Sequence, residues 1–179
     1  MQRQHVYVDD DQCCVKCGQS KFWTQEQLDA WNENNELFQC RPPKAEMWMN
    51  VAKEIAKQSC DPRLKVCALV VPEDNAGVLA CGYNGNYRGG PNRPESLEPG
   101  LSGFLHAEQN CLVKLDFNHP KKKHMYVTHS PCCLCSKLIV NANISRVVYN
   151  ELYRDASGLD ILNSSGVEVF NIAEAILID

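Results

Sequence analysis

The segment Met125-Tyr-Val-Thr128, followed after two residues by Pro131-Cys132-Cys133-Leu134-Cys135, decides how this chain folds. The first four residues predict a short strand, and the pattern over 133–142 predicts a helix that begins within the cysteines. A second motif, His106-Ala107-Glu108, lies near the start of another helical stretch, Phe104–Leu115. Both motifs are therefore predicted to lie where helices begin.

On both sides of these motifs, the spacing of apolar residues predicts alternating strands and helices. Residues 45–58 carry Met47, Val51 and Ile55 at helical spacing, and a turn at Asn75-Ala-Gly77 joins two strands into a hairpin. Alternation in the second half indicates crossover connections and parallel strands, and the hairpin makes the sheet mixed. The other expected elements are strands over Val66–Val71, Val78–Tyr83, Arg146–Asn150 and Val167–Asn171, and helices over 156–165 and Ala173–Ile178.

The composition is that of an ordinary globular chain. Its 179 residues are 44% hydrophobic and 22% charged, which argues against disorder, collagen and coiled coil. A net charge of −4 argues against tight nonspecific binding to nucleic acid. No stretch approaches the ~18 apolar residues of a membrane span, and the N-terminus lacks the apolar core of a secretory signal. We therefore expect a cytoplasmic protein that binds neither nucleic acid nor membrane.

Residues 1–44 differ from the rest of the chain. They are polar and rich in cysteine, and they end at Arg41-Pro-Pro43, a strong interruption of any regular element. We therefore expect two parts, a Cys-rich N-terminal segment over 1–44 and a main domain over 45–179. Within the first part, a short helix is predicted over Thr24–Leu37.

Eleven cysteines are the one anomaly in the composition. Disulfides, metal ligands and buried small side chains are competing explanations, and a reducing compartment favours the last two. Cysteines expected to pack in the core are Cys60, Cys67, Cys81 and Cys111. Candidate ligands of a structural zinc in the N-terminal segment are Cys14, Cys17 and Cys40, with His5, Cys13 or a histidine of the main domain as the open choice for a fourth. The alternative is a chance cluster in a disordered tail.

The two motifs, in this order, resemble the H-x-E…P-C-x-x-C signature of zinc-dependent nucleobase deaminases. The resemblance implies a zinc ion held by His106, Cys132 and Cys135. The residue types support this assignment, because zinc prefers thiolate and imidazole ligands and a catalytic site keeps its fourth position open for water. The alternative is a buried histidine on a helix with chance cysteines nearby.

The remaining residues of the signature have separate roles under this resemblance. Glu108 is then the proton carrier of a hydrolytic deamination and not a metal ligand. Cys133 is not assigned to the metal, because only Cys132 and Cys135 have the C-x-x-C spacing next to Pro131.

Further segments extend the resemblance to the deoxycytidylate (dCMP) deaminase family, over about residues 46–171. They are Ser59-Cys-Asp-Pro-Arg63-Leu-Lys-Val-Cys-Ala68, Gly82-Tyr-Asn-Gly85, His106-Ala-Glu-Gln-Asn110, Tyr126-Val-Thr128, Val147-Val-Tyr149 and Tyr153. The Gly-Tyr-Asn-Gly element is the most discriminating, because other zinc deaminases share the signature. The resemblance implies an α/β fold of the cytidine-deaminase type, in three α/β/α layers, with a mixed central sheet of about five strands.

The resemblance also implies an activity and its partners. The reaction is the conversion of dCMP to dUMP, the precursor of thymidylate, in a homo-oligomer that is commonly a hexamer. The effectors are dCTP as activator and dTTP as inhibitor, and Mg²⁺ could accompany a bound triphosphate. The alternatives are a deaminase of dCTP, of another cytosine nucleotide or of a nucleic-acid base, and a zinc-stabilised interaction module without catalysis.

Site residues follow from the same resemblance. Gly82, Tyr83, Asn84 and Gly85 belong to the triphosphate site, although Asn84 could instead touch the sugar of the substrate. The backbone N–H of Ala107 and the carbonyl of Ser130 recognise the base, and Tyr153 stacks on the pyrimidine.

The phosphate ligands are an open choice among several basic residues. The candidates are Arg63, Lys65, Arg88, Arg93 and Arg154. An arginine suits this role because a guanidinium binds phosphate through two parallel hydrogen bonds. Arg88 is preferred because Gly89-Gly90 beside it allows close backbone approach, within a long loop from Asn84 to Gly103. The alternative for each is a solvated surface arginine.

Overall fold

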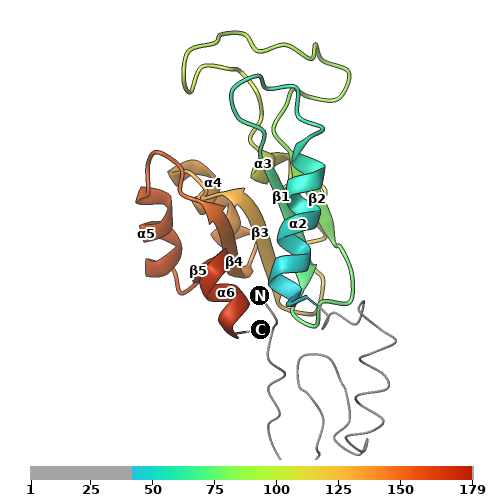
Figure 1. The fold of residues 1–179 in the computed structure, drawn as a ribbon, viewed down its shortest axis with the longest axis vertical. Helices are drawn as coiled ribbons and strands as arrows, with labels where there is room; N and C mark the ends of the chain where they lie inside the picture. The colour runs from blue at the N-terminus through green and yellow to red at the C-terminus, as the bar shows by residue number, and fades with distance from the viewer. Residues whose placement is uncertain (1–41, 179) are drawn as a thin grey trace, which may run out of the picture. The chain divides into compact units, whose positions relative to one another are not determined.

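Five strands form one mixed sheet, in the order β2-β1-β3-β4-β5, in the computed structural model, which describes residues 42–178 (Figure 1). β1 pairs antiparallel with β2 and β3, whereas β4 runs parallel to both β3 and β5. The strands are β1 Cys67–Pro72, β2 Ala80–Tyr83, β3 Lys123–His129, β4 Ile144–Glu151 and β5 Glu168–Asn171. The mixed sheet expected from the hairpin and the crossovers is therefore confirmed.

Helices cover both faces of the sheet, which makes three α/β/α layers. One face packs against α3 Ala107–Leu112, α4 Cys133–Asn141 and α5 Ser157–Ser164. The other face packs against α2 Lys44–Ala56 and α6 Ile172–Ile178. β1 is buried along its whole length because Ala68 and Val70 point into the first layer while Leu69 and Val71 point into the second.

The parallel half of the sheet determines where a site can form. β3 and β4 end side by side, with His129 opposite Glu151. The segment that leaves β3 leads through Pro131 into α4, so the cysteine motif lies just beyond the carboxyl end of a central strand. This edge is where open α/β sheets bind their ligands.

Most predicted elements agree with the structure to within a few residues, and α3 differs most. It spans only Ala107–Leu112, because Leu105 pairs in a short bridge with Gly85 and cannot join the helix. The helix expected over Thr24–Leu37 and the candidate ligands Cys14, Cys17 and Cys40 lie outside the described residues. Among the helices of 42–178, none combines the length and apolar character that a membrane crossing needs.

The close packing of β2 on α3 can be tested by substitution of Gly82. A Cβ at this position would lie 2.4 Å from the Cys111 nitrogen and 2.7 Å from the Ala107 oxygen, both backbone atoms. Gly82→Ala should therefore lower the free energy of unfolding by about 1–3 kcal/mol, measured by urea denaturation at fixed protein concentration. Gly77→Ala is the matched control, because no atom lies within 4 Å of its Cβ position. Equal unfolding free energies for the two variants would contradict the close packing.

Candidate active site

His106, Cys132 and Cys135 come together at one point, although 26 residues separate the first two. Their ligand atoms all lie within 4.8 Å of one another, and among the residues described no other group of three such side chains does so. The His106 Nδ1 atom lies 3.6 Å from the Cys132 Sγ and 3.4 Å from the Cys135 Sγ. Three soft or borderline donors thus converge on a space large enough for a single ion.

The positions of these side chains follow from how two helices begin. His106 is the N-cap of α3 and Cys132 the N-cap of α4, and both have extended backbone. The backbone N–H of His106 donates to the Gln109 side chain at 2.8 Å, and the Ser136 N–H donates to the Cys132 carbonyl at 2.9 Å. Each cap is therefore held by its own helix, and the contact between α3 and α4 brings the caps together.

The chemistry of the three donors fits zinc. Two sulfurs and one imidazole make the kind of three-ligand set that leaves a fourth position open. Hydrogen bonds from Cys135 and His106 lower the pKa of the Cys132 thiol to about 3, so this sulfur is a thiolate at neutral pH. The pKa of Cys135 is raised, mainly because its proton is shared with Cys132. Metal binding would replace that shared proton.

Glu108 places a buried carboxyl group beside the cluster. It lies in the first turn of α3 and is only 4% exposed. Burial is the main cause of its raised pKa, and the nearby His106 acts in the opposite direction. A carboxyl group with a raised pKa is suited to accepting and returning a proton near neutral pH.

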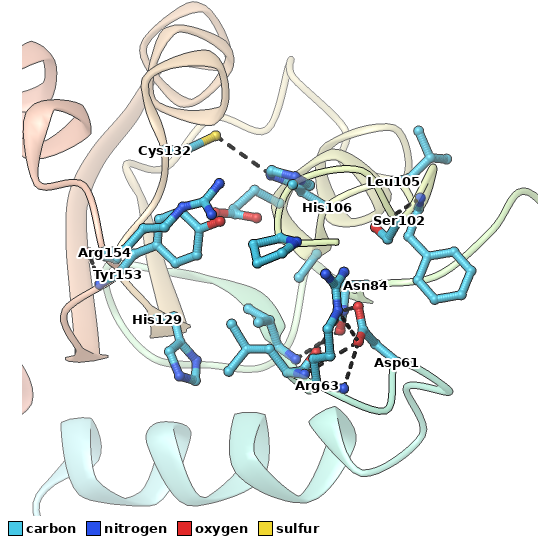
Figure 2. A pocket seen from close by; sticks show the side chains of 18 of the residues that line it. Asp61, Arg63, Asn84, Ser102, Leu105, His106, His129, Cys132, Tyr153 and Arg154 are labelled. Carbon is cyan, nitrogen blue, oxygen red and sulfur yellow. Dashed lines mark hydrogen bonds and ion pairs between the residues drawn. The ribbon is translucent and has the colours of Figure 1, made fainter. Parts of the chain in front are cut away.

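A cavity of about 450 Å³, the first cavity, opens onto this cluster (Figure 2). His106, Glu108 and Cys132 lie at one end of its lining. In the view of Figure 2, Tyr153 and Arg154 lie on one side of it, and Asp61, Arg63 and Asn84 on another. Its size is within the range of pockets that bind small molecules.

The residues expected to contact the base all line the first cavity. Ala107, Ser130 and Tyr153 belong to its wall. The Ser130 hydroxyl accepts a hydrogen bond from the Tyr153 N–H at 2.8 Å, so the end of β3 fixes the segment that follows β4. Because Ala107 is the first residue of α3, its N–H has no acceptor within the helix.

The expected triphosphate residues separate into two groups. A second cavity, of about 420 Å³, is lined by Tyr83, Asn84, Gly85 and Arg88, among others. Gly82 lines neither cavity, and its position is explained by its contact with the α3 backbone. Arg88, the residue preferred from the sequence as phosphate ligand, belongs to the second cavity and not to the one that His106 and Cys132 line.

Asn84 lies between the two cavities and contributes to both walls. Its Oδ1 accepts from the Val66 N–H at 2.8 Å, and its Nδ2 donates to the Leu64 carbonyl at 2.9 Å and to the Asp61 carboxylate at 3.4 Å. The carboxamide thus contacts the segment before β1. Both Nδ2 donors are therefore in use, whereas the Oδ1 atom can still accept one more hydrogen bond.

Two residues near the site, Gly158 and Asp61, have no role that the sequence alone predicts. A Cβ on Gly158 would lie 2.1 Å from the Pro131 carbonyl, so α5 packs directly on the cysteine motif. No local pattern reveals this contact, because the two segments are far apart in sequence. Asp61 accepts from the Arg63 N–H at 2.8 Å, a turn that the Asp-Pro pair at 61–62 could have indicated.

The cysteine assignment can be tested by metal content. Cys132→Ser and Cys135→Ser should each lose about one equivalent of zinc relative to the wild type, because each removes one of three ligands. Cys133→Ser is the matched control, since its Sγ lies 2.8 Å from the Ser157 hydroxyl and outside the cluster. Zinc is measured by inductively coupled plasma mass spectrometry after dialysis. Loss of zinc in the Cys133 variant alone would reverse the assignment.

Comparison with known proteins places this geometry in a family. Residues 42–151 match the family model described as the cytidine and deoxycytidylate deaminase zinc-binding region. Deoxycytidylate deaminase of Mycobacterium phage D29 is 35% identical over 61% of this chain and 95% of its own length. The human deoxycytidylate deaminase is 31% identical over 62% and 67%. The crystal structure of dCMP deaminase from the cyanophage S-TIM5, in complex with dCMP and dUMP, matches 74% of this chain and 99% of its own, with 37% identity and a TM-score of 0.64. The chain therefore belongs to the cytidine and deoxycytidylate deaminase family.

Proposed function

We propose that this protein is a hydrolase that deaminates dCMP to dUMP and ammonia, with zinc held by His106, Cys132 and Cys135. The observation that carries the proposal is the buried carboxyl of Glu108, which interacts with those three side chains and lines one cavity with His106 and Cys132. The similarity to proteins named deoxycytidylate deaminases supports the choice of substrate. So does the cyanophage enzyme, which was crystallised with both dCMP and dUMP.

Proton transfer and recognition of the base are assigned to different residues in this proposal. Zinc, when bound, lowers the pKa of a water molecule to about 7 and makes a nucleophile available at neutral pH. Glu108 would accept a proton from the attacking water, deliver it to the ring nitrogen next to the amino-bearing carbon, and assist departure of ammonia. The Ala107 N–H and the Ser130 carbonyl hold the edge of the base, while Tyr153 covers its face.

Arg154 is the better candidate for the 5′-phosphate. It lines the first cavity, and its guanidinium lies 5.3 Å from the centre of the Tyr153 ring. Within 42–178 it makes no ion pair or hydrogen bond, whereas Arg63 donates to two backbone carbonyls. A guanidinium that makes no hydrogen bond or ion pair within the described residues can bind a phosphate without first breaking a polar contact.

Regulation and assembly are further parts of the proposal. The second cavity, with Tyr83, Gly85 and Arg88, is the candidate site for dCTP as activator and dTTP as inhibitor, with Mg²⁺ on the triphosphate. Apolar side chains of Val113 and Leu134 are 79% and 56% exposed, which supports burial in a homo-oligomer, by resemblance a hexamer. A structural zinc on the N-terminal cysteines and a cytoplasmic location stay predictions.

A substrate panel with Glu108→Gln tests the proposed reaction. The wild type should release ammonia from dCMP faster than from dCTP, deoxycytidine or cytidine, and dCTP and dTTP added to the dCMP assay should change the rate in opposite directions. Glu108→Gln keeps the shape of the side chain but cannot carry the proton, so kcat should fall by about 10²–10⁴-fold with zinc content unchanged. Near-normal turnover in this variant would exclude the proton-transfer role.

Arg154→Ala separates recognition of the phosphate from recognition of the nucleoside. Loss of a charge-assisted contact should lower kcat/KM for dCMP by about 10–100-fold. The same variant should leave kcat/KM for deoxycytidine nearly unchanged, so the nucleoside serves as an internal control. An equal loss with both substrates would show that Arg154 supports the cavity and does not bind phosphate.

A further inference from the structure

We propose that Arg63 is a positioning residue, which holds the loop over 95–103 in place as one wall of the first cavity. Its guanidinium would then act on backbone carbonyls of the loop and not on the phosphate of a substrate. The inference rests on the proposed function only where it predicts an effect on turnover, because the hold on the loop can be measured without any reaction.

The loop forms a large part of the cavity wall. Pro99, Gly100, Ser102 and Gly103 all line the first cavity. Within the loop, the Glu95 N–H donates to the Ser102 carbonyl at 2.8 Å, so the two ends of the segment are joined. The loop is thereby a unit that can keep its own shape.

Few contacts fix this unit to the rest of the described chain. Its base is fixed by two backbone hydrogen bonds between Gly85 and Leu105, at 2.9 and 3.1 Å. Beyond the loop's own bonds and one with the adjacent Phe104, the hydrogen bonds of 95–103 within the described part of the chain are two, and both come from Arg63. As far as hydrogen bonds are concerned, the loop is therefore anchored at its base and at one further point.

That further point is a side-chain-to-backbone contact between segments that are 34 residues apart in sequence. The Arg63 Nη1 donates to the Leu97 carbonyl at 2.9 Å and to the Glu98 carbonyl at 2.5 Å. Both acceptors belong to the backbone, so the contact does not depend on the side chains of the loop. A guanidinium suits this role because its donors are charged and point in fixed directions.

The segment that carries Arg63 is itself held firmly. The Asp61 carboxylate accepts from the Arg63 N–H at 2.8 Å and lies 3.7 Å from its Nε. Asn84 holds Leu64 and Val66 through its carboxamide, and Ser59 donates to the Asn84 carbonyl at 2.8 Å. Asp61 and Asn84 are both buried, so the base of the Arg63 side chain has a defined position.

A positioning role and a phosphate-binding role predict different substrate dependence. If Arg63 bound the phosphate, its loss would impair dCMP but spare deoxycytidine, which has no phosphate. If Arg63 holds the wall, its loss disturbs the cavity for both molecules. The effect should then appear mainly in KM, since no group that carries the reaction has been removed.

The deciding experiment is amide hydrogen exchange of the full-length protein, followed by mass spectrometry of peptides that cover 95–103. Arg63→Ala should speed exchange there by about tenfold, because a charged hydrogen bond to the loop is lost. Arg63→Lys should restore most of the protection, since an ammonium can still donate to both carbonyls. Glu98→Ala is the matched control and should leave exchange unchanged, because it keeps the backbone acceptor.

Turnover of dCMP and deoxycytidine by the same variants provides the second measurement. Arg63→Ala should lower kcat/KM for both substrates by similar factors, and Arg63→Lys should recover both. Unchanged exchange over 95–103 in Arg63→Ala would overturn the proposal, and so would a loss confined to dCMP. If the wild type failed to deaminate dCMP, the proposed function would fail while the exchange measurement still decided the role of Arg63.

Discussion

The site depends on two helix starts that meet beyond the sheet. His106 and Cys132 are both N-cap residues, and each needs extended backbone immediately before its helix. This backbone places the cap side chain at the N-terminal end of its helix, so side chains from two caps can share one space. The positive ends of the two helix dipoles also favour a thiolate there. A shift of either helix would separate the donors, which explains why glycines occur where β2 meets α3 and where α5 meets the segment that begins α4.

Two glycines show how tightly these helices are placed. Gly82 lets β2 approach the backbone of α3, and Gly158 lets α5 approach the Pro131 carbonyl. In each case the room for a Cβ is already filled by backbone atoms of another segment. Gly82 falls in a motif that resemblance links to nucleotide binding, yet its contact here is with α3. A single glycine can therefore matter for the position of His106 or Cys132 through backbone packing alone.

The sequence predicted the sheet and the donor set because both leave a local pattern. The apolar run of β1 and the spacing of Cys132 and Cys135 can be recognised within a few residues. The roles of the arginines could not be recognised in that way. Arg63 and Arg88 look alike in sequence, and only the fold shows that one meets the carbonyls of a distant loop while the other lines the second cavity. Partners that are 34 residues apart leave no trace in local composition.

Asn84 and Phe104 line both cavities, and Asn84 also connects them through its hydrogen bonds. Its backbone and side chain hold the segment that precedes β1. That segment carries Arg63, which in turn reaches the wall of the first cavity. Hydrogen bonds therefore link a residue of the second cavity to the wall of the first through the short segment that precedes β1.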